Sequence, residues 1–130
     1  MTYEFLNWQV TAEYTGSKMA DWGITKNWNH HTVTVKNTQN GKWTCFDFWA
    51  SIAHPRVTSR YDTLNAFRCF VEDAISGDMD YKEFCAEFGY DEYDTRAKKT
   101  WKACQRSAEK LHRIYDGDLY ELANSMEEYA

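Results

Sequence analysis

The chain has 130 residues, of which 17% are aromatic and only one is proline, a composition typical of a packed domain and not of a disordered tail. Its net charge of −5 argues against general attraction to nucleic acid or to an anionic membrane. No apolar run approaches the roughly 20 residues of a transmembrane helix, and residues 1–10 lack a secretory signal pattern. We therefore expect a single cytoplasmic domain over residues 1–130.

The first strand signal lies near the start of the chain. Every second residue over residues 4–12 falls on one face of an extended segment. This pattern predicts one strand, with Leu6, Trp8 and Val10 as its apolar centre. Residues 13–30 then form a long connection, which we expect either to contain a short helical turn or to fold over the sheet.

A β-hairpin within residues 30–50 is the clearest of the predicted elements. Asn40-Gly41 is typical of a two-residue type I′ turn, whose two central residues both need a positive φ. This turn would place two apolar pairs on one side of the hairpin, Val35 with Phe46 and Val33 with Phe48. The other side would then pair Lys36 with Cys45, Thr34 with Asp47 and Thr32 with Trp49.

After residue 58 the apolar period changes from two residues to 3.6, which predicts helices. Ser59 and Asp62 form a capping-box pattern at the start of the first helix, and Gly77 ends it. The apolar side of this helix is expected to contain Tyr61, Leu64, Phe67, Val71 and Ile75.

Three further helical segments follow: residues 81–88, ended by Gly89, residues 95–115, and a last amphipathic turn or two after Gly117. Their apolar positions are Tyr81, Phe84, Cys85 and Phe88, then Ala97, Trp101, Cys104, Ala108, Leu111 and Tyr115, and finally Leu119, Leu122, Ala123 and Met126. The fold class is therefore α+β: a small antiparallel sheet with an Asn-Gly hairpin in residues 1–53, followed by three to four helices in residues 58–130.

Charge is segregated within the helical half. Residues 72–94 contain nine acidic side chains and one basic one, a net charge of −8, whereas residues 95–113 contain seven basic side chains and one acidic one, a net of +6. Acids before a helix and bases near its end favour the helix dipole, which explains part of this pattern. It does not explain five bases that share an arc of about 80° on one helix.

Two candidate partner-binding surfaces follow from this segregation. The first, which we call the acidic face, combines carboxylates with two tyrosines that can act as aromatic anchors. It consists of Asp80, Glu83, Glu87, Tyr90, Asp91, Glu92, Tyr93 and Asp94. The alternative, an anion-binding surface that we call the basic rail, consists of Lys99, Lys102, Arg106, Lys110 and Arg113.

Signals for catalysis or for a bound metal are weak. The sequence has no nucleophile elbow, phosphate-binding loop or zinc-protease pattern, and nothing orients His54 toward Cys45. His30 and His31 are adjacent, so in a strand they point to opposite faces and do not share one metal. The four cysteines are expected to be buried, reduced hydrophobic residues. We therefore expect no enzyme activity, no metal and no cofactor.

Most of the chain, from about residue 32 to residue 122, resembles small accessory proteins encoded by phages, prophages and other mobile elements. The resemblance depends on a hairpin that ends near a histidine, a Phe-Cys…Phe-Gly-Tyr-Asp segment and a basic Thr-Trp…Ala-Cys helix. Where that pattern often has Asp-Ser-Arg-Lys-Ala, this chain has Asp-Thr-Arg-Ala-Lys, and its first 30 residues have no counterpart. The matching positions are His54, Asp62, Leu64, Phe84, Cys85, Phe88, Gly89, Tyr90, Asp91, Asp94, Arg96, Ala97, Lys98, Thr100, Trp101, Ala103 and Cys104.

Most of these accessory proteins have no assigned activity. Because small acidic proteins of mobile elements are often antagonists of host defence, such as inhibitors of CRISPR effectors or of restriction enzymes, the resemblance favours a binding protein over an enzyme. Three hypotheses are therefore open. The first is an inhibitor that binds a nucleic-acid-handling host protein through the acidic face. The second is a nucleic-acid-binding accessory protein that uses the basic rail. The third is a small-molecule or metal-binding protein that uses His54 and the Trp-rich loop with Trp22 and Trp28.

Overall fold

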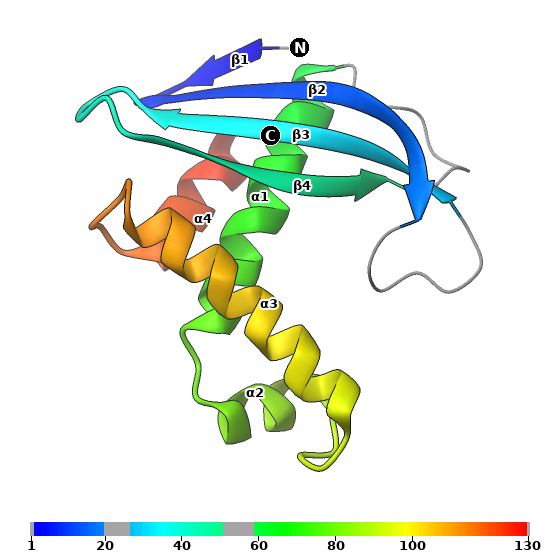
Figure 1. Cartoon of the computed structure of the whole chain (residues 1–130). Helices are drawn as coiled ribbons and strands as arrows, with labels where there is room; N and C mark the ends of the chain where they lie inside the picture. The colour runs from blue at the N-terminus through cyan, green and yellow to red at the C-terminus, as the bar shows by residue number, and fades with distance from the viewer. Residues whose placement is uncertain (1, 20–26, 51–58, 130) are drawn as a thin grey trace. The chain divides into compact units, whose positions relative to one another are not determined.

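The computed structural model describes residues 2–19, 27–50 and 59–129 of the chain. Four strands, Thr2–Phe5 (β1), Trp8–Met19 (β2), Asn27–Asn37 (β3) and Trp43–Ala50 (β4), form one antiparallel sheet in the order β1-β2-β3-β4 (Figure 1). Four helices follow: Arg60–Gly77 (α1), Tyr81–Phe88 (α2), Thr95–His112 (α3) and Leu119–Tyr129 (α4). The predicted α+β fold class is confirmed.

The chain divides into two compact units. The first contains the residues up to Phe67, and the second is Arg68–Glu128, so α1 contributes to both. Within the residues that the structure describes, no helix has the length and apolar character needed to cross a membrane.

The core of the first unit lies on one face of the sheet. Val10, Val33 and Val35 alternate along β2 and β3 and are fully buried, as the period of two requires. Phe67 of α1 is also fully buried, and its ring lies 5.2 Å from the ring of Trp8 between centroids. Aromatic packing therefore fixes the start of α1 on the sheet.

The predicted single strand over residues 4–12 is wrong, because the chain reverses at Leu6 and Asn7. Phe5 pairs with Trp8 across this turn, and Leu6, with a φ of 46°, is 57% exposed. The reversal brings Tyr3 and Phe5 to the buried side of the sheet. Burial of these two rings outweighs the cost of a positive φ at Leu6.

The expected long connection over residues 13–30 is also mostly wrong. β2 continues to Met19 and β3 begins at Asn27, and the two strands pair across a bulge between Tyr14 and Gly16. Gly16 has a φ of 107°, which suits a glycine at such a bulge. Trp22 lies outside the described residues.

The hairpin between β3 and β4 exists, but its turn and register differ from the prediction. Val33 pairs with Phe46, two residues away from the predicted pairing, and His31 pairs with Phe48. Only Gly41 has a positive φ, so the turn is not type I′. The shift by two residues keeps Val33, Phe46 and their neighbours on the predicted face.

A longer loop closes this hairpin because side chains and a neighbouring turn supply its hydrogen bonds. The Asn37 side chain accepts a bond from Gln39 N at 3.0 Å, and that of Asn40 accepts one from Lys42 N at 2.9 Å. Thr38 N donates to the carbonyl oxygen of Asn7 in the β1–β2 turn at 2.7 Å. The tight two-residue turn would lose these bonds.

The helix predictions are confirmed in their main features. Ser59 Oγ donates to Asp62 at 2.8 Å and accepts from Asp62 N at 3.1 Å, so the capping box is formed. α2 ends at Gly89, whose φ of 72° is the left-handed conformation that glycine favours. α3 ends at His112, three residues earlier than expected.

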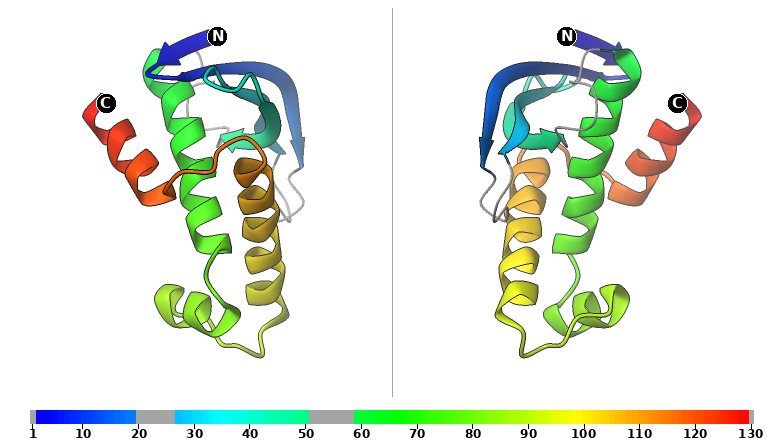
Figure 2. Two further views of the ribbon diagram at one scale, coloured as in Figure 1. Left: turned by 90° about the vertical axis from the view of Figure 1, so that its left-hand side faces the viewer. Right: turned by 90° about the vertical axis from the view of Figure 1, so that its right-hand side faces the viewer.

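In the second unit, α1 and α3 lie side by side, and α2 lies near one end of the pair (Figure 2). A methyl group on Gly77 would meet the carbonyl oxygen of Cys104 at 2.2 Å, so only glycine permits this approach of α1 to α3. α2 packs on α3 through a cluster of Phe84, Cys85, Ala97 and Cys104.

Candidate protein-binding site

The acidic face lies on α2 and on the loop that joins α2 to α3. Glu83, Glu87, Asp91 and Glu92 are exposed, and Tyr93 is 92% exposed. The fold therefore presents these predicted residues to solvent from one short stretch of the second unit.

Three of the carboxylates also hold the local backbone. Asp80 is the N-cap of α2 and accepts from Glu83 N at 2.8 Å, and Asp94 is the N-cap of α3 and accepts from Arg96 N at 2.9 Å. Asp91 accepts from Tyr93 N at 2.9 Å. Hydrogen bonds from Arg96 lower the pKa of Asp94 below its ordinary value. These three acids stabilise helix ends and the loop whether or not a partner binds.

We expect Asp94→Ala to lower the thermal midpoint by several degrees, because the first turn of α3 loses its cap. Asp94→Asn should retain most of the stability, since an amide oxygen also caps a helix. Thermal unfolding followed by circular dichroism checks both variants. Equal midpoints for the alanine and asparagine variants would contradict the capping role.

The remaining carboxylates of the acidic face have no such structural role. Glu83, Glu87 and Glu92 form no ion pair with any residue in the described part of the chain. The backbone carbonyl of Glu92 accepts from the Tyr81 hydroxyl at 2.6 Å, which leaves its side chain exposed. These three residues are therefore the ones whose charge can be changed with least effect on the fold.

The two tyrosines of the acidic face differ. Tyr90 stacks on the buried ring of Phe84, with centroids 5.7 Å apart and an interplanar angle of 23°, and remains 41% exposed. Tyr93 projects into solvent. Tyr90 is thus a fixed aromatic surface, whereas the Tyr93 ring is almost entirely exposed to solvent.

The basic rail is also open to solvent. Lys99, Lys102, Arg106 and Arg113 are exposed, and Lys110 is half-buried. Between residues 72–94 and residues 95–113 the described ion pairs are Asp94 with Arg96 and Asp78 with His112. Over the described ranges, Glu83, Glu87, Asp91 and Glu92 thus form no ion pair with the basic rail.

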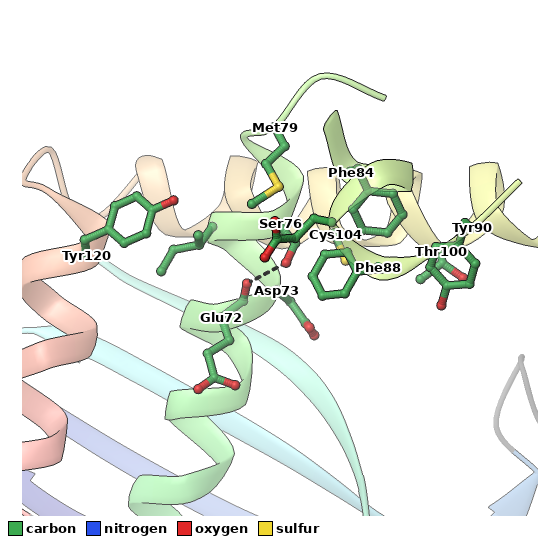
Figure 3. Close-up of a pocket in the computed structure, with 12 residues that line it drawn as sticks. Glu72, Asp73, Ser76, Met79, Phe84, Phe88, Tyr90, Thr100, Cys104 and Tyr120 are labelled. Carbon is green, nitrogen blue, oxygen red and sulfur yellow. Dashed lines mark hydrogen bonds between the residues drawn. The ribbon is translucent and has the colours of Figure 1, made fainter. Parts of the chain in front are cut away.

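A pocket of about 500 Å³ adjoins the acidic face. Figure 3 shows the residues that line it, which come from α1, α2, the segments around them, α3 and α4. We call it the aromatic pocket. It is lined by Glu72, Asp73, Ile75, Ser76, Met79, Phe84, Glu87, Phe88, Tyr90, Thr100, Cys104 and Tyr120.

The charged residues that line the aromatic pocket are all acidic. Burial, with a smaller contribution from the neighbouring Glu72 carboxylate, raises the pKa of Asp73 to about 6. Burial and then the Asp73 charge raise the pKa of Cys104 to about 11, so this thiol stays neutral at physiological pH. A neutral thiol is a poor nucleophile, so Cys104 is poorly suited to covalent catalysis.

A second hollow of about 390 Å³ shares Ile75, Met79 and Tyr120 with the aromatic pocket. Its acidic lining residues are Asp78, Glu83 and Asp118. His112 also lines it, and His112 Nε2 lies 2.9 Å from an oxygen of Asp78. The acidic character thus extends beyond the predicted face along the surface of the second unit.

The two adjacent histidines of β3, His30 and His31, are buried within the sheet unit. His30 is only 3% exposed, and its ring nitrogens contact the Thr15 hydroxyl and, at 2.8 Å, Asp47 Oδ1. A buried imidazole needs partners for both nitrogens, and this arrangement supplies them. His30 and His31 lie on opposite faces, as predicted: the His30 ring packs near Trp49, and the His31 ring near Tyr14.

The cysteines agree in part with the prediction. Cys85 and Cys104 are buried and Cys69 is partly buried, but Cys45 is exposed because its side chain lies on the outer face of β4. His54 lies outside the described residues, so its relation to Cys45 is not defined. Over the described ranges, no three His, Cys, Asp or Glu side chains are grouped so that they could hold a metal ion.

Sequence reasoning placed Glu87 and Tyr90 at the site but missed other pocket residues. Glu72 and Asp73 belong to the same acidic run, yet they lie on α1 and reach α2 only in the folded second unit. The signal that could have found them is their position one turn from Gly77, where α1 approaches α3. Phe88, predicted as an apolar packing position, is 50% exposed at the pocket.

No protein-family model, curated protein or solved structure matches this chain significantly.

Proposed function

We propose that this protein is a non-catalytic, phage-type inhibitor that acts in the cytoplasm of a host cell. It binds a basic surface of a nucleic-acid-handling defence protein, such as a CRISPR effector, through the acidic face. Binding there obstructs nucleic-acid loading or a conformational step of the target. The proposal requires no metal and no cofactor.

One observation carries the proposal: apart from Asp94, the carboxylates of the acidic face are exposed, and within the described residues none of them forms an ion pair with the basic rail. A protein surface that binds nucleic acid is positively charged, so it complements this face. Electrostatic complementarity speeds encounter and fixes orientation, and Tyr90 and Tyr93 add aromatic contact area.

The test begins with capture of bacterial proteins on the tagged full-length chain. Each nucleic-acid-binding protein that is recovered is then purified and titrated. We expect Glu83→Lys combined with Glu92→Lys to reduce its association rate about tenfold or more and to weaken the salt dependence of binding. Neither side chain caps a helix or forms a described ion pair, so the fold is retained.

The matched control is a double reversal on the basic rail, Lys99→Glu with Arg106→Glu. Under the proposed function it leaves binding of the partner intact. An association rate that changes less than twofold on reversal of Glu83 and Glu92 would reject the acidic face as the binding surface.

Exposure of the basic rail supports a second candidate function, binding of nucleic acid. It predicts a complex with DNA that weakens steeply with salt and that the same Lys99→Glu and Arg106→Glu control abolishes. The control variant thus separates the two functions, because only one of them depends on the rail.

A further inference from the structure

The aromatic pocket combines carboxylates with exposed aromatic rings. Three carboxylates, Glu72, Asp73 and Glu87, line it, and none of its described lining residues is basic. Phe88 and Tyr90 also line it and are 50% and 41% exposed. Negative charge therefore lies beside open aromatic rings.

The carboxylates of the pocket have no cationic partner within the described ranges. Glu72, Asp73 and Glu87 form no ion pair there. Asp73 and Glu72 are also adjacent on α1, so that like charges repel in a partly desolvated position. A cation that entered the pocket would relieve this repulsion.

The apolar and aromatic lining distinguishes between possible cations. A lysine ammonium group is compact and strongly hydrated, and it loses much hydration energy in such a site. A guanidinium group is planar and weakly hydrated; it stacks on aromatic rings and pairs with carboxylates through its edge. The volume of about 500 Å³ is also that of a ligand pocket, for which the usual range is roughly 300–1,000 Å³.

The pocket is continuous with the proposed interface, because Glu87 and Tyr90 belong to both. A group that enters the pocket from a bound protein would therefore lie at the edge of the contact with the acidic face. Arginine is common on surfaces that bind phosphate, so a nucleic-acid-handling protein offers such a group.

We infer that the aromatic pocket binds an arginine side chain of the partner protein. The carboxylates of Glu72, Asp73 and Glu87 pair with the guanidinium group, and the rings of Phe88 and Tyr90 pack against its plane. This inference rests on the proposed function, to which it adds the chemical identity of the anchor.

The test uses the full-length, isotope-labelled protein and three short peptides, acetyl-Gly-Arg-Gly-amide and its lysine and citrulline counterparts. Citrulline has nearly the shape of arginine without its charge. We expect the arginine peptide to shift the amide signals of Asp73, Phe88 and Tyr90 in a saturable titration. The lysine peptide should bind several-fold more weakly, and the citrulline peptide about tenfold more weakly.

Two results would overturn the inference. One is equal binding of the arginine and citrulline peptides, which would make the pocket an apolar groove. The other is a set of shifts confined to residues outside the pocket. Glu83→Lys with Glu92→Lys does not change the pocket lining, so the peptides should bind this variant as they bind the unmodified protein. Suppose that Glu83→Lys with Glu92→Lys loses partner binding, but the arginine peptide does not bind in the pocket. The inference about arginine would then be refuted, and the proposed function would still stand.

Discussion

Phe67→Ala is expected to lower the free energy of unfolding by about 4 kcal/mol. The Phe67 side chain is fully buried, and its ring lies 6.1 Å from that of Phe5 and 5.2 Å from that of Trp8 between centroids. The substitution removes the transfer free energy of the ring and leaves a cavity that the rigid sheet cannot fill. Because total stabilities are about 5–15 kcal/mol, a large share would be lost.

Phe88→Ala is the matched control, because it makes the same chemical change at a side chain that is 50% exposed. We expect it to cost about 1 kcal/mol or less, since little burial is lost. Urea titration followed by tryptophan fluorescence measures both variants. Comparable losses at the two positions would show that Phe67 does not anchor α1 on the sheet.

The elements that the sequence predicted well are those with local causes. The capping box at Ser59 and Asp62, and the glycine stop at Gly89, depend on residues within one helical turn. Their structure follows from short-range hydrogen bonds and from the conformational freedom of glycine. Such signals are readable before any tertiary contact is known.

The errors have tertiary causes. Asn40-Gly41 is a strong signal for a tight turn, but the bond from Thr38 N to Asn7 favours a longer loop, and Asn7 is more than 30 residues away in the chain. Apolar and polar residues alternate across Leu6 as they would in one continuous strand. The reversal of the chain at this position is favourable only because it buries Tyr3 and Phe5. Local patterns cannot reveal either contact.

The candidate site divides in the same way. Segregated charge identified the acidic face, since that face lies on one continuous stretch of sequence. The aromatic pocket also needs Glu72 and Asp73 from α1, Cys104 from α3 and Tyr120 from α4. Only the packing of the second unit brings these residues together, so the pocket was not predictable from spacing.

Asp73→Asn should stabilise the protein at neutral pH and at the same time weaken binding of the arginine peptide about tenfold. Desolvation raises the pKa of Asp73 in the folded state from 3.8 to about 6, so the folded protein holds this proton more tightly than the unfolded chain. Ionisation therefore costs stability progressively as pH rises from about 4 to about 6, and the asparagine variant escapes this cost. Since solvent reaches the side chain and screens its charge, we expect a gain of about 1 kcal/mol at neutral pH.

The pH dependence separates this explanation from a general effect of the substitution. The gain in stability should vanish below about pH 3, where the carboxyl group is protonated in both the folded and the unfolded state. Binding of the arginine peptide to the unmodified protein should fall below pH 6, whereas the variant should show no step there. The other titratable groups at the pocket, Glu72, Glu87, Tyr90, Cys104 and Tyr120, are present in both proteins, so the comparison isolates Asp73.

Asp116→Asn is the matched control, because it removes the same charge at an exposed position that does not line the pocket. It should leave both the stability profile and the peptide affinity unchanged. In a cation-binding site, a desolvated carboxylate lowers the stability of the unbound protein. Pairing with the cation offsets this cost when the partner binds. If Asp73→Asn binds the arginine peptide as well as the unmodified protein does, Asp73 does not pair with the guanidinium group. The desolvation of its carboxylate would then lower stability without contributing to binding.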